Sequence, residues 1–140
     1  MNEAIFTKAF ELVRRSETCL LGSIDSNGFP AIRAMLQPRE IEGMKTLYFS
    51  TNTSSRHVAE FRQNDKASVY FYDPNLFQGF LLRGRIQVRC DQECKNRLWR
   101  DGDNVYYQLG PTDPDYCALL FTAQNGRWYE DFKKTDIDIK

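Results

Sequence analysis

The sequence FLLRGRIQVRC, residues 80–90, alternates apolar and polar side chains along almost its whole length. Successive side chains of a β-strand point to opposite faces of the sheet, so this pattern predicts a strand with one buried and one polar face. The residues expected on the buried face are Phe80, Leu82, Ile86, Val88 and Cys90. The polar face carries Arg83, Arg85 and Arg89, a basic stripe that fits either salt bridges on a solvated surface or recognition of an anionic substrate or nicotinamide phosphate.

Other segments that are expected to form strands precede and follow residues 80–90 in the sequence. The expected strands are residues 19–25, 30–37, 46–51 and 67–72 upstream, and residues 116–123 and 127–130 downstream. Asn27-Gly28 and Asn125-Gly126 separate neighbouring segments, and Asn-Gly is a strong short-range signal of a hairpin turn. Hairpins dominate, and the regular alternation of strands and helices that builds a parallel sheet is missing. The sequence therefore predicts a mainly β fold, a six-stranded antiparallel barrel with peripheral helices.

Helical segments interrupt the strands. Hydrophobic residues recur at helical spacing over residues 2–15, which predicts an amphipathic helix. Further helices are expected at residues 53–64, at 91–99 with Asp91 near the N-cap, and at 103–109. The residues of the 53–64 helix expected to face inward are Val58, Ala59 and Phe61. No repeat or flexible linker interrupts this order, so the whole chain, residues 1–140, is expected to form a single domain.

Composition narrows the possible functions. The chain has 19 acidic and 19 basic side chains, so no overall field attracts nucleic acid or anionic lipid. No apolar run approaches the roughly 18 residues that span a bilayer, and residues 1–10 lack the pattern of a signal peptide, so we expect a cytoplasmic protein. The chain has a single histidine, His57, and its four cysteines lack the paired spacing of a zinc site, so no metal is expected.

Residues 49–58, FSTNTSSRHV, carry the clearest signal of a binding site. A strand runs into a hydroxyl-rich turn that opens a helix, and the first backbone N–H groups of a helix have no internal partners and favour negative charge. Arg56 and His57 stand in that first turn, where acidic residues are normally preferred. A bound phosphate explains this inversion, because an arginine fork and hydroxyl groups both donate to phosphate oxygens. A plain helix cap with solvated side chains is the alternative.

Several motifs, taken in order, resemble the FMN-binding split-barrel superfamily that includes pyridoxamine 5′-phosphate oxidase. They are Ile32-Arg33-Ala34-Met35, the segment FSTNTSSR at 49–56, Val69-Tyr70-Phe71, Leu82-Arg83-Gly84-Arg85 and Trp128-Tyr129. The likeness covers roughly residues 5–131 and is greatest to the short branch often called general stress protein 26-like. It implies a homodimer that binds flavin mononucleotide (FMN) at the subunit interface.

The resemblance also implies which residues contact the cofactor. That set is Arg33, Ala34, Met35, Phe49, Ser50, Thr51, Ser55, Arg56, His57, Gln78 and Trp128. Arg33 and residues 55–57 would hold the phosphate, and the backbone of residues 33–35 and 49–51 would follow the edge of the isoalloxazine ring. Gln78 would offer a polar side chain to the ring. Trp128 would pack near it, or would be an ordinary core aromatic residue.

Three departures from the family pattern bear on activity. His57 stands where relatives usually carry lysine, so we expect FMN affinity to weaken as pH rises above neutrality. The chain ends at Lys140, without the C-terminal extension of the true pyridoxamine phosphate oxidases, and Pro38 replaces a further basic residue. Oxidation of pyridoxamine phosphate is therefore not expected.

The expected function is that of a flavin-dependent oxidoreductase acting on a small molecule, with no catalytic side chain of its own. The alternatives are a non-enzymatic flavin-binding protein of the stress response, the same fold with a deazaflavin or haem, and a ligand-free barrel in which Arg33 and Arg56 pair with carboxylates.

Overall fold

The structure, a computed structural model, describes residues 3–139 and contains a single antiparallel sheet of eight strands. The strands are β1 Thr18–Ile24, β2 Pro30–Leu36, β3 Glu40–Glu42, β4 Thr46–Asn52, β5 Lys66–Asp73, β6 Gln78–Arg89, β7 Tyr116–Glu130 and β8 Lys133–Asp138. The helices are α1 Glu3–Arg15, α2 Arg56–Gln63 and α3 Gln92–Leu98, with short 3₁₀ turns η1 Asp103–Val105 and η2 Gly110–Thr112. None of the helices within the described residues is long and apolar enough to cross a membrane.

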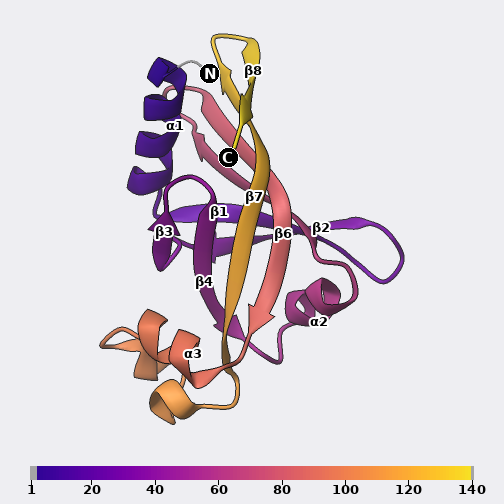
Figure 1. The fold of residues 1–140 in the computed structure, drawn as a ribbon, viewed down its shortest axis with the longest axis vertical. Coiled ribbons are helices and arrows are strands. Elements are labelled where there is room, and N and C mark those ends of the chain that lie inside the picture. Colours follow the sequence, from indigo (N-terminus) through magenta and orange to yellow (C-terminus); the bar gives the residue numbers. More distant parts are fainter. Residues whose placement is uncertain (1–2, 140) are drawn as a thin grey trace.

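The strands follow the order β2-β1-β5-β6-β7-β4-β3, and β8 pairs with β7. The long strands β6 and β7 lie side by side in the middle of the sheet (Figure 1). The sheet curls around a core to which α1 contributes Ala9, Leu12 and Val13. The prediction of a mainly β, antiparallel fold is confirmed. Residues 116–123 and 127–130, expected as separate strands, form the single strand β7, and the short β3 and the C-terminal β8 bring the count to eight against the expected six.

The predicted hairpin at Asn125-Gly126 is wrong. β7 runs without a turn through both residues and pairs with β6 on either side of them. The register shifts between Arg83 and Gly84, where β7 has one extra residue, so this is the site of a β-bulge. The hairpin lies instead at Asp131-Phe132, whose positive φ angles of 53° and 62° match the tight turns between antiparallel strands. Continuous pairing with β6 outweighs the local turn preference of Asn-Gly.

The helices agree with the sequence except at their ends. The first, expected at residues 2–15, covers Glu3–Arg15, and Asn2 lies outside the described residues. α2 starts three residues later than predicted, because Thr53 still bonds through its backbone N–H to the Asp115 carbonyl. Asp91 caps α3 as predicted, accepting the Cys94 N–H at 3.1 Å. The expected helix at 103–109 is reduced to the single turn η1.

The alternation in β6 is confirmed up to Val88, whereas Cys90, one residue beyond the strand, is exposed. All three arginines of the basic stripe have partners. Arg83 donates to Asn125, Arg85 pairs with Asp65, and Arg89 pairs with Asp91. Two of the three arginines are thus in ion pairs with carboxylates, and Arg83 donates to a neutral amide.

Candidate functional site

The predicted phosphate site has two parts, Arg33 on β2 and the segment that runs from β4 into α2, and helix α2 brings them together. The strands β2 and β4 are separated in the sheet by four other strands, so Arg33 and residues 49–51 do not meet through strand pairing. α2 follows β4 in the chain, yet its Glu60 contacts both Ser23 of β1 and Arg33 of β2. The resulting polar group, here named the Arg33 cluster, comprises Ser23, Arg33, Thr51, Ser55, His57 and Glu60.

Arg33 is the centre of the cluster. Its Nη1 donates to the Leu21 carbonyl at 3.0 Å, and its Nη2 donates to Glu60 Oε1 at 3.2 Å. Burial lowers the pKa of Arg33, while the Glu60 carboxylate opposes that shift. A guanidinium has five N–H donors, so within residues 3–139 three of them have no partner. These two contacts thus hold the guanidinium group in place and leave its other N–H donors free for a ligand.

His57 lies beside the same group. Its Nε2 is 2.8 Å from Thr51 Oγ1 and 3.1 Å from Ser55 Oγ. Burial, and then the charge of Arg33, lower the pKa of His57 below its ordinary value of 6.5, and Glu60 opposes this effect. At neutral pH the imidazole is consequently neutral when no anion is bound.

The first turn of α2 is open to a ligand. Among the described residues no side chain caps the helix, since the Ser55 hydroxyl donates instead to the Asn52 carbonyl at 2.7 Å. The Arg56 side chain is exposed, and nothing within residues 3–139 forms a hydrogen bond or ion pair with it. The preceding turn is held by Asp115, which accepts from Ser54 N at 2.8 Å. The unused N–H groups of this turn and Arg56 can therefore both meet an anion.

The sequence reasoning missed Glu60 and Ser23. Glu60 was not considered because Ala59 was expected to face inward, but Ala59 is exposed and Glu60 is 9% exposed. Val58 and Phe61 are buried as predicted. A buried glutamate needs a donor or a cation, and Ser23 Oγ at 2.6 Å and Arg33 supply both. At 3.6 residues per turn, position 60 lies about 160° from position 58 and about 100° from position 61, so helical spacing gave no signal of its burial.

The other predicted residues are spread more widely. Ala34 points to the opposite face of β2 from Arg33, and Phe49 is a core residue. Met35 packs against that core, and Ser50 is half-buried on β4. For these residues the expectation concerned the backbone of β2 and of β4.

Gln78 and Trp128 lie away from the Arg33 cluster. Gln78 donates to Glu130 Oε2 at 2.6 Å and accepts from Arg15 at 3.2 Å. Trp128 is 2% exposed within its own chain and packs against Phe80, with ring centroids 6.3 Å apart. The structure thus gives Trp128 the place of a core aromatic residue.

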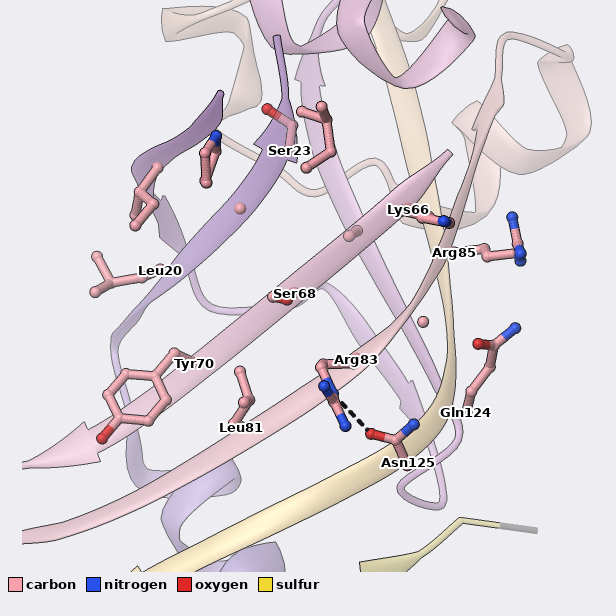
Figure 2. Close-up of a pocket in the computed structure, with 16 residues that line it drawn as sticks. Leu20, Ser23, Lys66, Ser68, Tyr70, Leu81, Arg83, Arg85, Gln124 and Asn125 are labelled. Carbon is pink, nitrogen blue, oxygen red and sulfur yellow. Dashed lines mark hydrogen bonds between the residues drawn. The ribbon is translucent and has the colours of Figure 1, made fainter. Parts of the chain in front are cut away.

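A cavity of about 680 Å³ lies over the outer face of the sheet. Figure 2 shows Leu20, Tyr70 and Leu81 at one end of it, and Lys66 and Arg85 with the Arg83–Asn125 pair toward the other. Ile32 and Gly22 also line it. Ile32 and Arg33 are adjacent in β2, so their side chains leave opposite faces of that strand, but Ser23 of the Arg33 cluster also lines the cavity and the two sites adjoin there.

Comparison with protein families matches residues 5–128 to the family model described as pyridoxamine 5′-phosphate oxidase. A crystal structure of a protein related to general stress protein 26 of B. subtilis, from Clostridium acetobutylicum, is 40% identical. The alignment covers 99% of this chain and 97% of that one, with a TM-score of 0.91. Comparison with curated proteins found no match.

Two more distant structures share the fold. A pyridoxamine 5′-phosphate oxidase-related, FMN-binding protein from Nostoc punctiforme is 18% identical, with 98% and 95% of the two chains covered and a TM-score of 0.74. A heme-binding protein from Mycobacterium smegmatis is 13% identical, with 99% of this chain and 59% of that chain covered and a TM-score of 0.78. These likenesses confirm the split barrel and the general stress protein 26-like resemblance. The chain belongs to the pyridoxamine 5′-phosphate oxidase family.

Proposed function

We propose that this protein binds FMN, with the phosphate held by Arg33, Arg56 and His57 at the first turn of α2. The observation that carries the proposal is that the guanidinium of Arg33, from the terminal strand β2, bonds to Glu60 of α2 and acts on His57 in the first turn of that helix, whose N-cap has no side-chain hydrogen bond. Thr51 adds a hydroxyl group at the same place, whereas the proton of the Ser55 hydroxyl is already donated to the Asn52 carbonyl. This donor set fits a phosphate monoester dianion, because charged donors, hydroxyls and free amides all favour negative charge.

The family relationship supports FMN as the molecule that carries this phosphate, since a structural neighbour is an FMN-binding protein. Bound flavin would supply the hydride or electron transfer, so the chain itself needs only to bind and orient it. We therefore propose a flavin-dependent oxidoreductase acting on an unidentified small molecule. The four cysteines are free thiols, which is typical of a reducing compartment and supports a cytoplasmic location.

Two alternatives have specific support. The similarity to general stress protein 26 keeps open a non-enzymatic flavin-binding role in the stress response. Haem is a second candidate because one structural neighbour binds it. His57 fits that role poorly, since its Nε2 already contacts two hydroxyl groups and the ring is partly buried.

Titration of the purified protein with FMN, followed by flavin fluorescence, tests the phosphate site. Arg56→Ala should weaken FMN binding about 3- to 10-fold, because an exposed charge-assisted contact contributes on the order of 1 kcal/mol. It should leave thermal stability unchanged. Arg62→Ala, in the last turn of the same helix, is the matched control and should bind FMN like the unmodified protein. Equal affinities for Arg56→Ala and the unmodified protein would place the phosphate elsewhere.

The protonation of His57 gives a second test. The imidazole is neutral in the free protein, and a phosphate dianion would favour its protonated form, so binding takes up a proton. FMN affinity should then fall as the pH rises from 6 to 8.5. A flat profile contradicts a phosphate contact by His57.

Anaerobic mixing with NADH or NADPH separates the enzyme from a flavin-binding protein without catalytic activity. Rapid bleaching of the flavin absorbance, followed by turnover with an acceptor, is the expected result. If bound FMN is not reduced, the non-enzymatic role is supported. A Soret band in the spectrum of the purified protein would indicate haem instead.

The outer face of β2 supports the expected homodimer. Pro30, Ile32, Ala34 and Leu36 are all exposed on this terminal strand of the sheet and form an apolar stripe. Ile32 also borders the cavity of Figure 2, so the stripe continues into an apolar part of the sheet surface. Contiguous exposed apolar surface of this kind marks an interface. We propose that a second copy of the chain covers it.

Mass measurement by light scattering tests the dimer. Ile32→Glu should convert a dimer into a monomer. Position 32 is 68% exposed in the single chain, so the charge of the introduced glutamate would be buried only in the dimer interface. Val105→Glu, at an 83% exposed site on η1, is the control and should stay dimeric. A monomeric unmodified protein would contradict the proposal.

A further inference from the structure

Two cysteines face each other where the ladder between β6 and β7 ends. The last paired residues are Arg89 and Ala118, so the same register continued by one residue sets Cys90 opposite Cys117, and Cys90 is among the groups that act on the Cys117 thiol. Val88 pairs with Leu119 two residues earlier. Because side chains two residues apart in a strand share a face, Cys90 and Cys117 point to the same side. The two strand ends lie together at the end of the barrel near α2 (Figure 1).

The spacing of an antiparallel ladder suits a disulfide. Directly opposed residues have Cα atoms about 4.5 or 5.5 Å apart, and a disulfide needs about 4.4 to 6.8 Å. Cys90 also contributes to the environment of Cys117, since it is among the groups that raise the pKa of the Cys117 thiol. A bond between them therefore needs little backbone movement.

The two thiols differ in a way that suits a two-step reaction. Cys90 is exposed, and Arg62 Nη2 donates to its sulfur at 3.6 Å. Cys117 is fully buried, and burial is the main cause that raises its pKa to about 11. Cys90 is thus the thiol that an oxidant can reach, and Cys117 is the thiol that can react with it afterwards.

The other two cysteines have no such arrangement. Cys19 is paired in the sheet with Met35. Cys94 is near Cys90 in the sequence, but it packs in a separate cluster with Ala118, whose side chain leaves the opposite face of β7 from Cys117. Cys117 is therefore the partner that the ladder places opposite Cys90.

We propose that Cys90 and Cys117 form a reversible disulfide when the protein meets a peroxide. The Cys90 sulfur attacks one oxygen of hydrogen peroxide, the O–O bond breaks, and a sulfenic acid and one water form. The Cys117 sulfur then attacks the Cys90 sulfur, the S–O bond breaks, and a second water leaves as the S–S bond forms. In total, two thiols lose two protons and two electrons, and the peroxide is reduced to two waters. A dithiol reductant reverses the change.

Trypsin distinguishes this disulfide from the alternative within residues 90–94. Cleavage after Arg89, Lys95, Arg100 and Arg127 leaves Cys90 and Cys94 in one peptide, residues 90–95, and Cys117 in another, residues 101–127. The ligand-free, full-length protein is treated with hydrogen peroxide, and its remaining thiols are alkylated under denaturing conditions. The protein is then digested with trypsin, and the masses of the peptides are measured by mass spectrometry. Because no FMN is present, the result does not depend on the proposed function.

The expected product links peptides 90–95 and 101–127, with Cys94 alkylated, and dithiothreitol added before alkylation restores all four thiols. Cys90→Ser removes an exposed group and should keep every remaining thiol under the same treatment. Cys94→Ala is the matched control and should still lose two thiols. A bond between Cys90 and Cys94, a link only between two chains, or an unmodified or irreversibly oxidised Cys90 would overturn the proposal.

Discussion

Replacement of Arg33 by alanine separates a phosphate site from a purely structural ion pair. The substitution leaves the Glu60 carboxylate, which is 9% exposed, without its cation. Breaking a buried pair costs about 3–5 kcal/mol, and since the Arg33 side chain is 22% exposed we expect about 2–4 kcal/mol here. For a domain of this size that lowers the melting temperature by roughly 6–12 °C.

The same substitution should weaken FMN binding. Arg33 has free donors beside the first turn of α2, and a hydrogen bond to a charged group is worth about 1.5–3 kcal/mol, or roughly 10- to 150-fold in the dissociation constant. Loss of stability alone could imitate this effect. The double variant Arg33→Ala with Glu60→Gln removes the unpaired charge, while the amide oxygen still accepts from Ser23.

Thermal unfolding and FMN titration are therefore measured on Arg33→Ala, Glu60→Gln and the double variant. The double variant should recover most of the lost stability and none of the lost FMN affinity. If it binds FMN as tightly as the unmodified protein, Arg33 only balances Glu60, and the phosphate site is refuted.

The remaining predictions concern stability. The pKa of His57 is lowered in the folded protein, so below about pH 6.5 the unfolded chain binds the proton more readily and the free energy of unfolding should fall as the pH drops. Denaturant titration at pH 7.5 and 5.5 should show a smaller fall for His57→Gln. Gly84→Ala should destabilise the barrel by several kcal/mol, since the added Cβ would collide with the Thr122 carbonyl. Gly22→Ala is the control, because an added Cβ there would have no neighbour nearer than 3.7 Å. Equal melting temperatures for the two variants would contradict the packing around Gly84. Phe132→Gly should raise stability by about 1 kcal/mol, because Phe132 is 91% exposed and has a φ of 62°; a lower melting temperature would argue against this turn.

The positions of most elements could be predicted because their signals are local. The alternation in residues 80–88 and the helical spacing in residues 3–15 reflect which face of each element is buried, and both were read correctly. Asp91 was likewise recognisable as a helix cap from its place before α3. The mistake at Asn125-Gly126 shows the limit of this approach. Its turn preference is local too, but eleven paired residues on β6 hold β7 straight.

By itself, the sequence determined the antiparallel strands, the helix that follows β4, and the residue types able to meet a phosphate. The tertiary structure alone decided that Arg33 of β2 meets His57 and Glu60 of α2, because β2 and β4 are not neighbours in the sheet and only its curvature brings them to one helix. It also decided the register between β6 and β7 that, continued by one residue, sets Cys90 opposite Cys117, since pairing register depends on which distant strands come together. Contacts between residues far apart in the chain form through closure of the barrel, and no local pattern records that closure.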